Sequence, residues 1–107
     1  MLVCPLALGG HVDHVLVRRA AESLGWSLQY YADIPYLLNN PQTLAPAITP
    51  FTGQLYRISE DGLKAWLEGV AAFKSQISSL YKKEGTLDSA IRSYWKVRDG
   101  INLWHVV

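Results

Sequence analysis

The stretch from Pro5 to Arg18 constrains the fold of this chain more than any other part of its sequence. It reads Pro-Leu-Ala-Leu-Gly-Gly-His-Val-Asp-His-Val-Leu-Val-Arg, so a Gly9-Gly10 pair separates an apolar run from residues that favour a helix. Glycines allow the backbone to bend sharply and a ligand to come close. Residues 1–5 predict a short buried strand, and residues 12–24 predict an amphipathic helix.

The predicted helix over residues 12–24 has apolar side chains on one face and charged side chains on the other. The face expected to be buried carries Val17, Ala20, Ala21 and Leu24, and Gly25 is a natural C-terminal stop. Residues 27–31 then predict a second strand of aromatic character. A strand, a helix and a strand with short links form a right-handed crossover in a parallel sheet, which binds ligands beyond the carboxyl ends of its strands.

His11, Asp13 and His14 lie together where this helix is expected to begin. The spacing lets both imidazoles lean to one side, neutral imidazole is the commonest metal ligand, and a nearby carboxylate such as that of Asp13 can fix a histidine tautomer. The same residues also fit a helix cap with polar surface neighbours. A catalytic zinc needs three protein ligands, and this stretch offers one or two. From spacing alone, both interpretations stay open.

Four segments of the chain, in order, resemble those of one known family. They are His11-Val12-Asp13-His14 after a strand, a proline and a glycine turn, Tyr30-Tyr31-Ala32-Asp33-Ile34-Pro35-Tyr36, Phe73-Lys74-Ser75-Gln76-Ile77, and Leu103-Trp104. The family is that of the PIG-L/LmbE-like zinc-dependent N-deacetylases, which remove acetyl groups from N-acetylglucosaminyl and related amides. The resemblance covers essentially the whole chain.

The resemblance implies roles for three residues of the first segment. His14 corresponds to a ligand of zinc, or of another divalent metal in its place. His11 corresponds to the residue that polarises the amide carbonyl and assists departure of the amine, and Asp13 to the residue that orients His11. The implied partner is a small N-acetylated sugar or sugar conjugate.

The chain departs from the family by lacking its first motif. No His-Pro or Asp-Asp pair occurs in the 107 residues, whereas the family's His-Pro-Asp-Asp supplies two more zinc ligands and the general base. The chain is therefore expected to be a single domain over residues 1–107 that forms the C-terminal part of a deacetylase. Its expected fold is α/β, an incomplete Rossmann-like three-layer α/β/α arrangement with a mainly parallel sheet. The alternative function is a catalytically incomplete fragment or a non-enzymatic binding module.

Residues 33–53 contain four of the five prolines and predict a long loop. Asp33 is the only acidic residue of this loop. It is a candidate for contact with a substrate hydroxyl, for a supporting role behind the site, or for capping a turn. Tyr36 is a second candidate substrate contact, because with Tyr30 and Tyr31 it is suited to a sugar-stacking wall. Aromatic clusters of this kind also serve as core packing.

The second half of the chain predicts a strand over residues 54–58, a long helix, a helix from residue 86 or 87 to about 99, and a strand over 101–107. Ser59 is the expected N-cap of the long helix, whose apolar side chains recur at helical spacing as far as residues 82–85. That stripe, expected to be core, comprises Leu63, Trp66, Leu67, Val70, Phe73, Ile77, Leu80 and Tyr81. Ser75 and Gln76 are expected to form hydrogen bonds on the helix face, and the lone His105 to be structural.

Composition limits the classes of partner and compartment. Half of the residues are apolar and 18% are charged, which is typical of a globular domain. The net charge of +1 gives no indication of a nucleic-acid or membrane-surface partner. The single cysteine, Cys4, is expected to be a buried small hydrophobe. With no secretory or membrane-spanning pattern, a cytoplasmic location is expected unless N-terminal signals are missing, and a homo-oligomer is compatible with the sequence.

Overall fold

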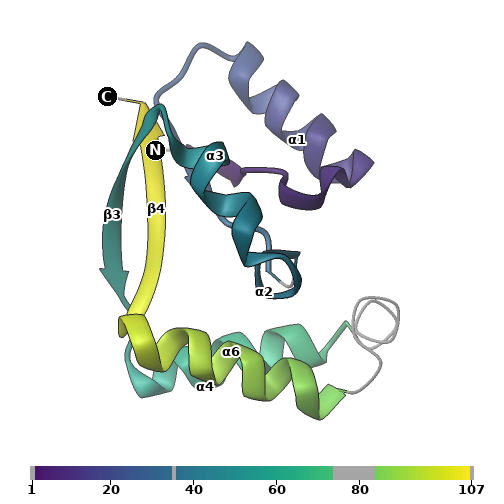
Figure 1. Ribbon diagram of the computed structural model, residues 1–107, viewed down its shortest axis with the longest axis vertical. Helices are drawn as coiled ribbons and strands as arrows, with labels where there is room; N and C mark the ends of the chain where they lie inside the picture. The colour runs from purple at the N-terminus through teal and green to yellow at the C-terminus, as the bar shows by residue number, and fades with distance from the viewer. Residues whose placement is uncertain (1, 35, 74–83, 107) are drawn as a thin grey trace. The chain divides into compact units, whose positions relative to one another are not determined.

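The computed structural model describes residues 2–34, 36–73 and 84–106, and it has an α/β fold with a four-stranded sheet (Figure 1). The strands are β1 (Leu2–Pro5), β2 (Leu28–Tyr31), β3 (Phe51–Arg57) and β4 (Gly100–Val106), in the order β1-β2-β4-β3. The chain divides into two units, one of Met1–Gln54 with Asn102–Val107 and one of Leu55–Ile101.

The described residues form five α-helices and two short 3-10 helices. They are η1 (Leu8–Gly10), α1 (Val12–Ser23), α2 (Tyr36–Asn39), η2 (Pro41–Thr43), α3 (Leu44–Ile48), α4 (Glu60–Ala71) and α6 (Glu84–Arg98). Within the described part of the chain, no helix combines the length and the apolar character that crossing a bilayer would require.

The sheet is mixed, so the prediction of a mainly parallel sheet is wrong. β1 and β2 are parallel, with Leu2 opposite Leu28, as the strand–helix–strand pattern predicts. β4 runs antiparallel to β2, with Tyr30 opposite Trp104. An apolar run predicts a strand but carries no information about its direction, which depends on where the preceding element delivers the chain.

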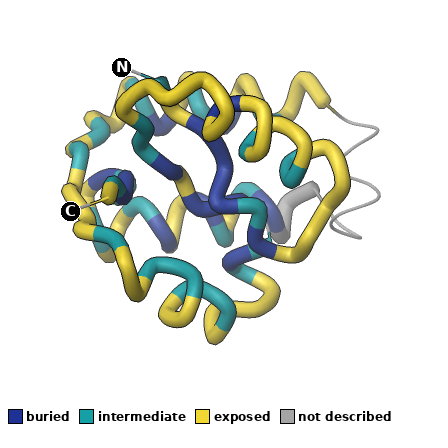
Figure 2. The backbone as a smooth tube through the Cα atoms, turned by 90° about the horizontal axis from the view of Figure 1, so that it is seen from above, coloured by how far each residue is buried: buried dark blue, intermediate teal, exposed yellow. Residues whose placement is uncertain are grey.

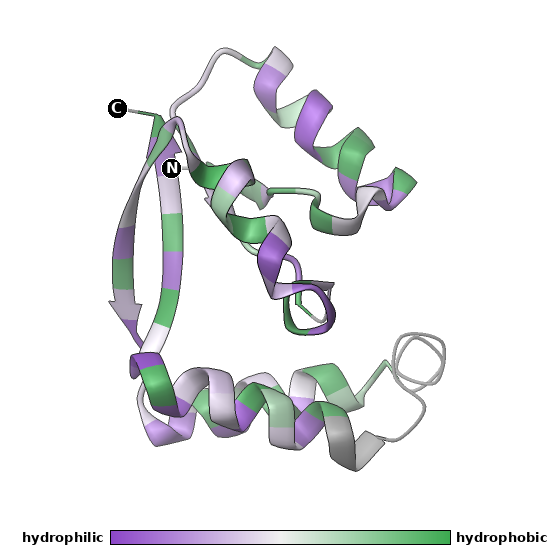
Figure 3. Cartoon of the chain, in the orientation of Figure 1, coloured by the Kyte–Doolittle hydropathy of each residue, from purple (hydrophilic) through white to green (hydrophobic). Residues whose placement is uncertain are grey.

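Helix α1 forms where predicted but turns a different face inward. Of the four residues expected to be buried, only Ala21 is buried, while Val17 and Leu24 are exposed. Figure 2 shows how buried and exposed stretches alternate along the backbone. Apolar and polar segments alternate along this helix in Figure 3. Its partly buried positions include His14 and Arg18, and the Arg18 guanidinium donates a hydrogen bond of 2.8 Å to the Leu6 carbonyl oxygen. Polar partners next to β1 therefore set the orientation of the helix.

The prediction of a long loop over residues 33–53 is also wrong. This segment forms α2, η2 and α3 before β3 begins at Phe51. Pro41 occupies the first position of η2, and Pro46 lies in the first turn of α3. Proline is tolerated in the first turn of a helix because the amide it lacks has no partner there, so these prolines do not break the structure.

In the unit Leu55–Ile101, the predicted cap and the final helix are confirmed. The Ser59 hydroxyl oxygen accepts a hydrogen bond of 3.1 Å from the Gly62 amide at the start of α4. Leu63 and Leu67 of α4 are buried, and α6 contributes Ile91, which is only 1% exposed. Helix α4 ends at Ala71, earlier than predicted, and Phe73 is 66% exposed. Residues 75–77, 80 and 81, for which helical positions are predicted, lie outside the described residues.

The end of α6 explains why glycine occupies position 100. Asp99, not Gly100, adopts the left-handed conformation that stops the helix, with a φ of 59°. The Asp99 carbonyl oxygen accepts a hydrogen bond of 3.1 Å from the Ile58 amide. A side-chain carbon on Gly100 would collide with the Tyr56 carbonyl oxygen and lie 2.8 Å from the Arg57 Cα. Gly100 therefore allows two backbone segments to approach closely.

Replacing Gly100 with alanine is expected to destabilise the protein by at least about 1–3 kcal/mol, because backbone atoms must move to admit the methyl group. Gly69→Ala is the matched control, since nothing lies within 4 Å of the added carbon and the residue is in α4. The control is expected to stabilise by about 0.5–1 kcal/mol. Urea unfolding of both variants measures the difference, and equal midpoints would contradict the close approach at Gly100.

Candidate functional site

The glycine turn after β1 is shaped by left-handed backbone conformations. Gly9 and Gly10 have φ angles of 79° and 66°, and Ala7 has a φ of 64°. The ring of Tyr36 packs on Gly9, where a side-chain carbon would lie 2.7 Å from the ring atom Cδ1. The turn and the first residue of α2 therefore form one packed unit.

Asp33 lies behind this turn as the buried acidic group of the site. Its side chain is 0% exposed. One carboxylate oxygen, Oδ1, accepts a hydrogen bond of 3.0 Å from the Leu8 amide, and Oδ2 lies 2.5 Å from the His14 Nδ1. The Asp33 carbonyl oxygen accepts a hydrogen bond of 2.9 Å from the Leu37 amide. Asp33 thus joins β2, the turn, α1 and α2, and both carboxylate oxygens have protein partners.

His11, His14 and Tyr36 form a cluster of rings at the start of α1. The two imidazole centroids are 5.3 Å apart, and Tyr36 lies 6.4 Å from His11 and 6.1 Å from His14. The His14 side chain is 35% exposed, so the ring is partly accessible from solvent although Asp33 covers Nδ1. Four of the five predicted site residues, counting Asp33, therefore lie close together.

Asp13, the fifth predicted residue, contacts His11 mainly through its backbone. The His11 Nδ1 accepts a hydrogen bond of 3.3 Å from the Asp13 amide, so His11 caps α1. The Asp13 carboxylate lies 4.0 Å from the same nitrogen, and its side chain is 78% exposed. Asp13 is expected to be the carboxylate that supports His11. A closer and fully buried carboxylate, that of Asp33, contacts the other histidine, His14.

The donors available for a metal are few. Among the residues that the structure describes, no group of three or more His, Cys, Asp or Glu side chains is arranged to hold a metal ion. His14 has one ring nitrogen, Nε2, beyond the one that faces Asp33. An imidazole nitrogen backed by a carboxylate is a common zinc donor, so this residue fits one position of a zinc site.

A second set of contacts, around Arg18, was not anticipated from the sequence. The Arg18 guanidinium lies 4.9 Å from the centre of the Tyr30 ring and forms an ion pair of 3.4 Å with Glu22. The Tyr30 hydroxyl donates a hydrogen bond of 2.9 Å to the same carboxylate. The four-residue spacing of Arg18 and Glu22 is a sequence signal for their pairing, but nothing local indicates Tyr30.

The three tyrosines do not form one wall. Tyr30 is buried and stacks on Phe51, with ring centres 4.9 Å apart, so it is core packing. Tyr31 is its neighbour on β2, and adjacent side chains of a strand point to opposite faces. Only Tyr36 approaches the histidines. Cys4 is buried as expected, and burial raises the pKa of its thiol, which disfavours a nucleophilic thiolate.

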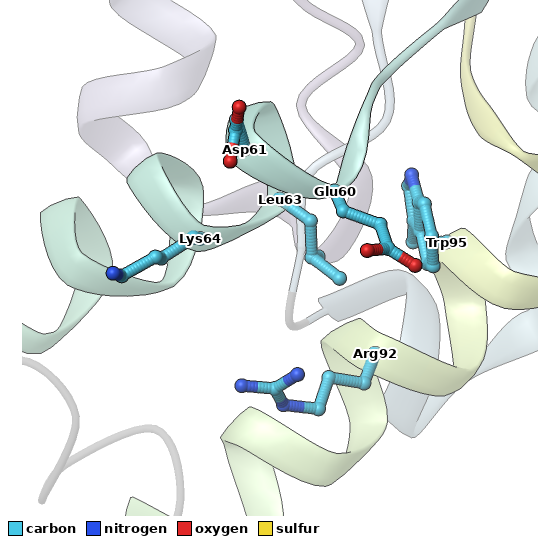
Figure 4. Close-up of a pocket in the computed structure, with 6 residues that line it drawn as sticks. All are labelled: Glu60, Asp61, Leu63, Lys64, Arg92 and Trp95. Carbon is cyan, nitrogen blue, oxygen red and sulfur yellow. The ribbon is translucent and has the colours of Figure 1, made fainter.

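A separate cavity of about 390 Å³ lies in the unit Leu55–Ile101, between residues of α4 and α6 (Figure 4). Its lining residues are Glu60, Asp61, Leu63, Lys64, Arg92 and Trp95. Two of its polar groups are already bound, since Arg92 pairs with Asp88 at 2.7 Å and the Trp95 indole donates to the Ile58 carbonyl oxygen at 2.6 Å. None of the predicted site residues lines it, so the histidine cluster remains the candidate site.

Comparison with known proteins gives no match. No family model, no curated protein and no solved structure matches the chain.

Exchanging each glycine of the turn for alanine separates backbone strain from packing. Gly10→Ala is expected to cost about 1–2 kcal/mol, because only its left-handed conformation is strained and nothing lies within 4 Å of the new carbon. Gly9→Ala bears the same strain and must also displace the Tyr36 ring, so we expect a further 1–3 kcal/mol or so. Urea unfolding measures both, and NMR signals of the Tyr36 ring are expected to shift only in Gly9→Ala. Equal effects would contradict the packing of Tyr36 on Gly9.

Burial and, secondarily, the Glu22 carboxylate raise the pKa of Tyr30 to about 12. Between its ordinary value of 10.0 and about 12, the unfolded chain releases the phenolic proton while the folded chain retains it. Stability is therefore expected to fall as pH rises through this window. Absorbance of tyrosinate in wild type and Tyr30→Phe identifies this residue, and Glu22→Gln is expected to lower its pKa. A pKa of Tyr30 at its ordinary value would contradict both its burial and its contact with Glu22.

Proposed function

We propose that this chain supplies the His-x-Asp-His half of a zinc-dependent N-deacetylase site, which hydrolyses the acetamide of an N-acetylglucosaminyl-type or related amide. The observation that carries the proposal is the 2.5 Å contact between His14 and Asp33. These residues belong to two different segments of the resemblance, and the contact supports a common site for them. The proximity of His11 and Tyr36 supports the same conclusion.

We also propose that the α/β structure is part of a Rossmann-like three-layer domain. The parallel pairing of β1 and β2 around α1 supports this arrangement. The histidines follow the carboxyl end of β1, which is the side where open α/β sheets bind ligands.

In this proposal, His14 holds the metal through Nε2, since Nδ1 faces Asp33. A bound zinc ion polarises a carbonyl group and lowers the pKa of a coordinated water. His11 would donate a hydrogen bond from Nε2 to the acetyl carbonyl oxygen and, once it has taken up the proton that the general base removes from the attacking water, would pass a proton to the departing amine. Asp13 keeps His11 in place through its amide, and Tyr36 contacts the sugar. The remaining metal ligands and the general base come from a polypeptide segment other than the described residues.

The alternative is a non-enzymatic binding module or a catalytically incomplete chain. The observation that favours it is that the described residues offer the imidazole of His14 without two further metal ligands beside it. The two candidates differ in one property that is simple to measure, namely metal content that depends on His14.

Zinc content of the purified chain, measured by mass spectrometry, tests the proposal. We expect the wild type to retain more zinc than His14→Ala, because that variant removes the donor nitrogen, and to approach one ion per site only where a second copy or another segment supplies the remaining ligands. The matched control is His105→Gln, which alters the histidine of β4 and is expected to retain zinc. Hydrolysis of N-acetylglucosamine conjugates is expected to follow zinc content.

Two outcomes would count against the deacetylase. If His14→Ala kept the zinc content and activity of the wild type, His14 would not be a ligand. If the wild-type chain held no zinc and hydrolysed no N-acetyl conjugate at any zinc concentration, the alternative of a catalytically incomplete chain or a binding module would be favoured.

A further inference from the structure

We propose that the chain holds His14 and His11 in opposite neutral tautomers, and that Asp33 is the positioning residue for His14. The tautomers are inferred from contacts alone, whereas their use in deacetylation rests on the proposed function. Asp33 then acts through His14 and does not touch substrate. This differs from the substrate contact that the sequence suggests for Asp33.

The first step concerns His14. An ionised carboxylate only accepts hydrogen bonds, so the ring nitrogen that faces the Asp33 Oδ2 at 2.5 Å carries the proton. With the proton on Nδ1, the lone pair of the neutral ring is on Nε2. The other oxygen of Asp33 accepts from the Leu8 amide at 3.0 Å, and the side chain is 0% exposed. The carboxylate is therefore fixed and has no oxygen available for a substrate.

The second step concerns His11, whose Nδ1 has the opposite role. It accepts a hydrogen bond of 3.3 Å from the Asp13 amide, so it carries a lone pair. The proton of the neutral ring is then on Nε2. A backbone amide always donates, so this bond favours the same tautomer whichever way the Asp13 side chain turns.

Together, these contacts give the two neighbouring rings different chemistry. His14 presents a lone pair at Nε2, which suits a metal, and His11 presents an N–H at Nε2, which suits a carbonyl oxygen. With ring centres 5.3 Å apart, the two groups lie close enough to act on one amide. Two identical residues thus acquire the roles of ligand and donor from their hydrogen-bond partners.

Asp33→Asn tests this arrangement with little change in side-chain volume. The Leu8 amide still requires an acceptor, and asparagine has a single acceptor oxygen in its side chain. That oxygen is expected to face Leu8, which turns the NH₂ group toward the His14 Nδ1. Because NH₂ only donates, His14 is expected to move its proton to Nε2 and lose the lone pair there.

The measurement is a nitrogen-15 NMR correlation spectrum of the histidine rings in the metal-free chain. It is recorded at about pH 8.5, where imidazole side chains are ordinarily neutral. In the wild type we expect His14 to favour the Nδ1–H form by about tenfold or more, as a hydrogen bond to a charged group provides, and His11 to favour Nε2–H. In Asp33→Asn, we expect His14 to favour Nε2–H while His11 is unchanged. Asp13→Asn is the control, and both rings are expected to keep their wild-type tautomers in it.

The wild-type spectrum decides the proposal even if Asp33→Asn does not fold. His14 as Nε2–H, or as a doubly protonated imidazolium, would overturn it, and so would His11 as Nδ1–H. A folded Asp33→Asn in which His14 stays Nδ1–H would remove Asp33 from its positioning role. Opposite tautomers in a chain that never hydrolyses an amide would contradict the proposed function and leave this inference intact. Amide hydrolysis that depends on His14, in a chain whose histidines have the wrong tautomers, would contradict this inference and leave the proposed function intact.

Discussion

The buried carboxylate of Asp33 is the interaction on which the described site depends. An ionised carboxylate removed from water is costly unless hydrogen bonds replace the lost hydration. Asp33 obtains them from the Leu8 amide and from His14, so the glycine turn and α1 must both be present and correctly placed. One side chain, two residues beyond the end of β2, thereby fixes the geometry of a turn and a helix that precede it in the chain.

The same requirement explains why α1 exposes apolar side chains. The positions of α1 that face β1 include His14, which meets Asp33, and Arg18, which meets the Leu6 carbonyl oxygen. These polar contacts occupy the inner face, so apolar residues such as Leu16 and Val17 lie on the outer face. Helix α1 therefore forms the hydrogen bonds that its buried neighbours require, and in doing so leaves apolar side chains on its outer face exposed to solvent.

Local signals in the sequence predict most of the elements. Spacing, capping residues and nearby glycines are enough to predict several features. These are the helix after the glycine pair, the parallel pairing of β1 and β2, the Ser59 cap, and the last helix and strand. The predictions that are wrong depend on distant partners. The direction of β4, the inward face of α1 and the short helices after Asp33 are each decided by packing that no short window of sequence contains.

In the candidate site, too, local sequence predicts some features while distant partners decide others. The spacing of His11 and His14 places them together, and Asp13 is the obvious carboxylate because it lies between them. The structure pairs His14 with Asp33, 19 residues away, whereas the exposed Asp13 contacts His11 through its amide and, at 4.0 Å, through its carboxylate. Proximity in sequence indicates which residues share a site, but hydrogen-bond partners decide the proton on each ring nitrogen. Since those partners lie on different elements, the chemistry of each histidine depends on the fold as well as on its motif.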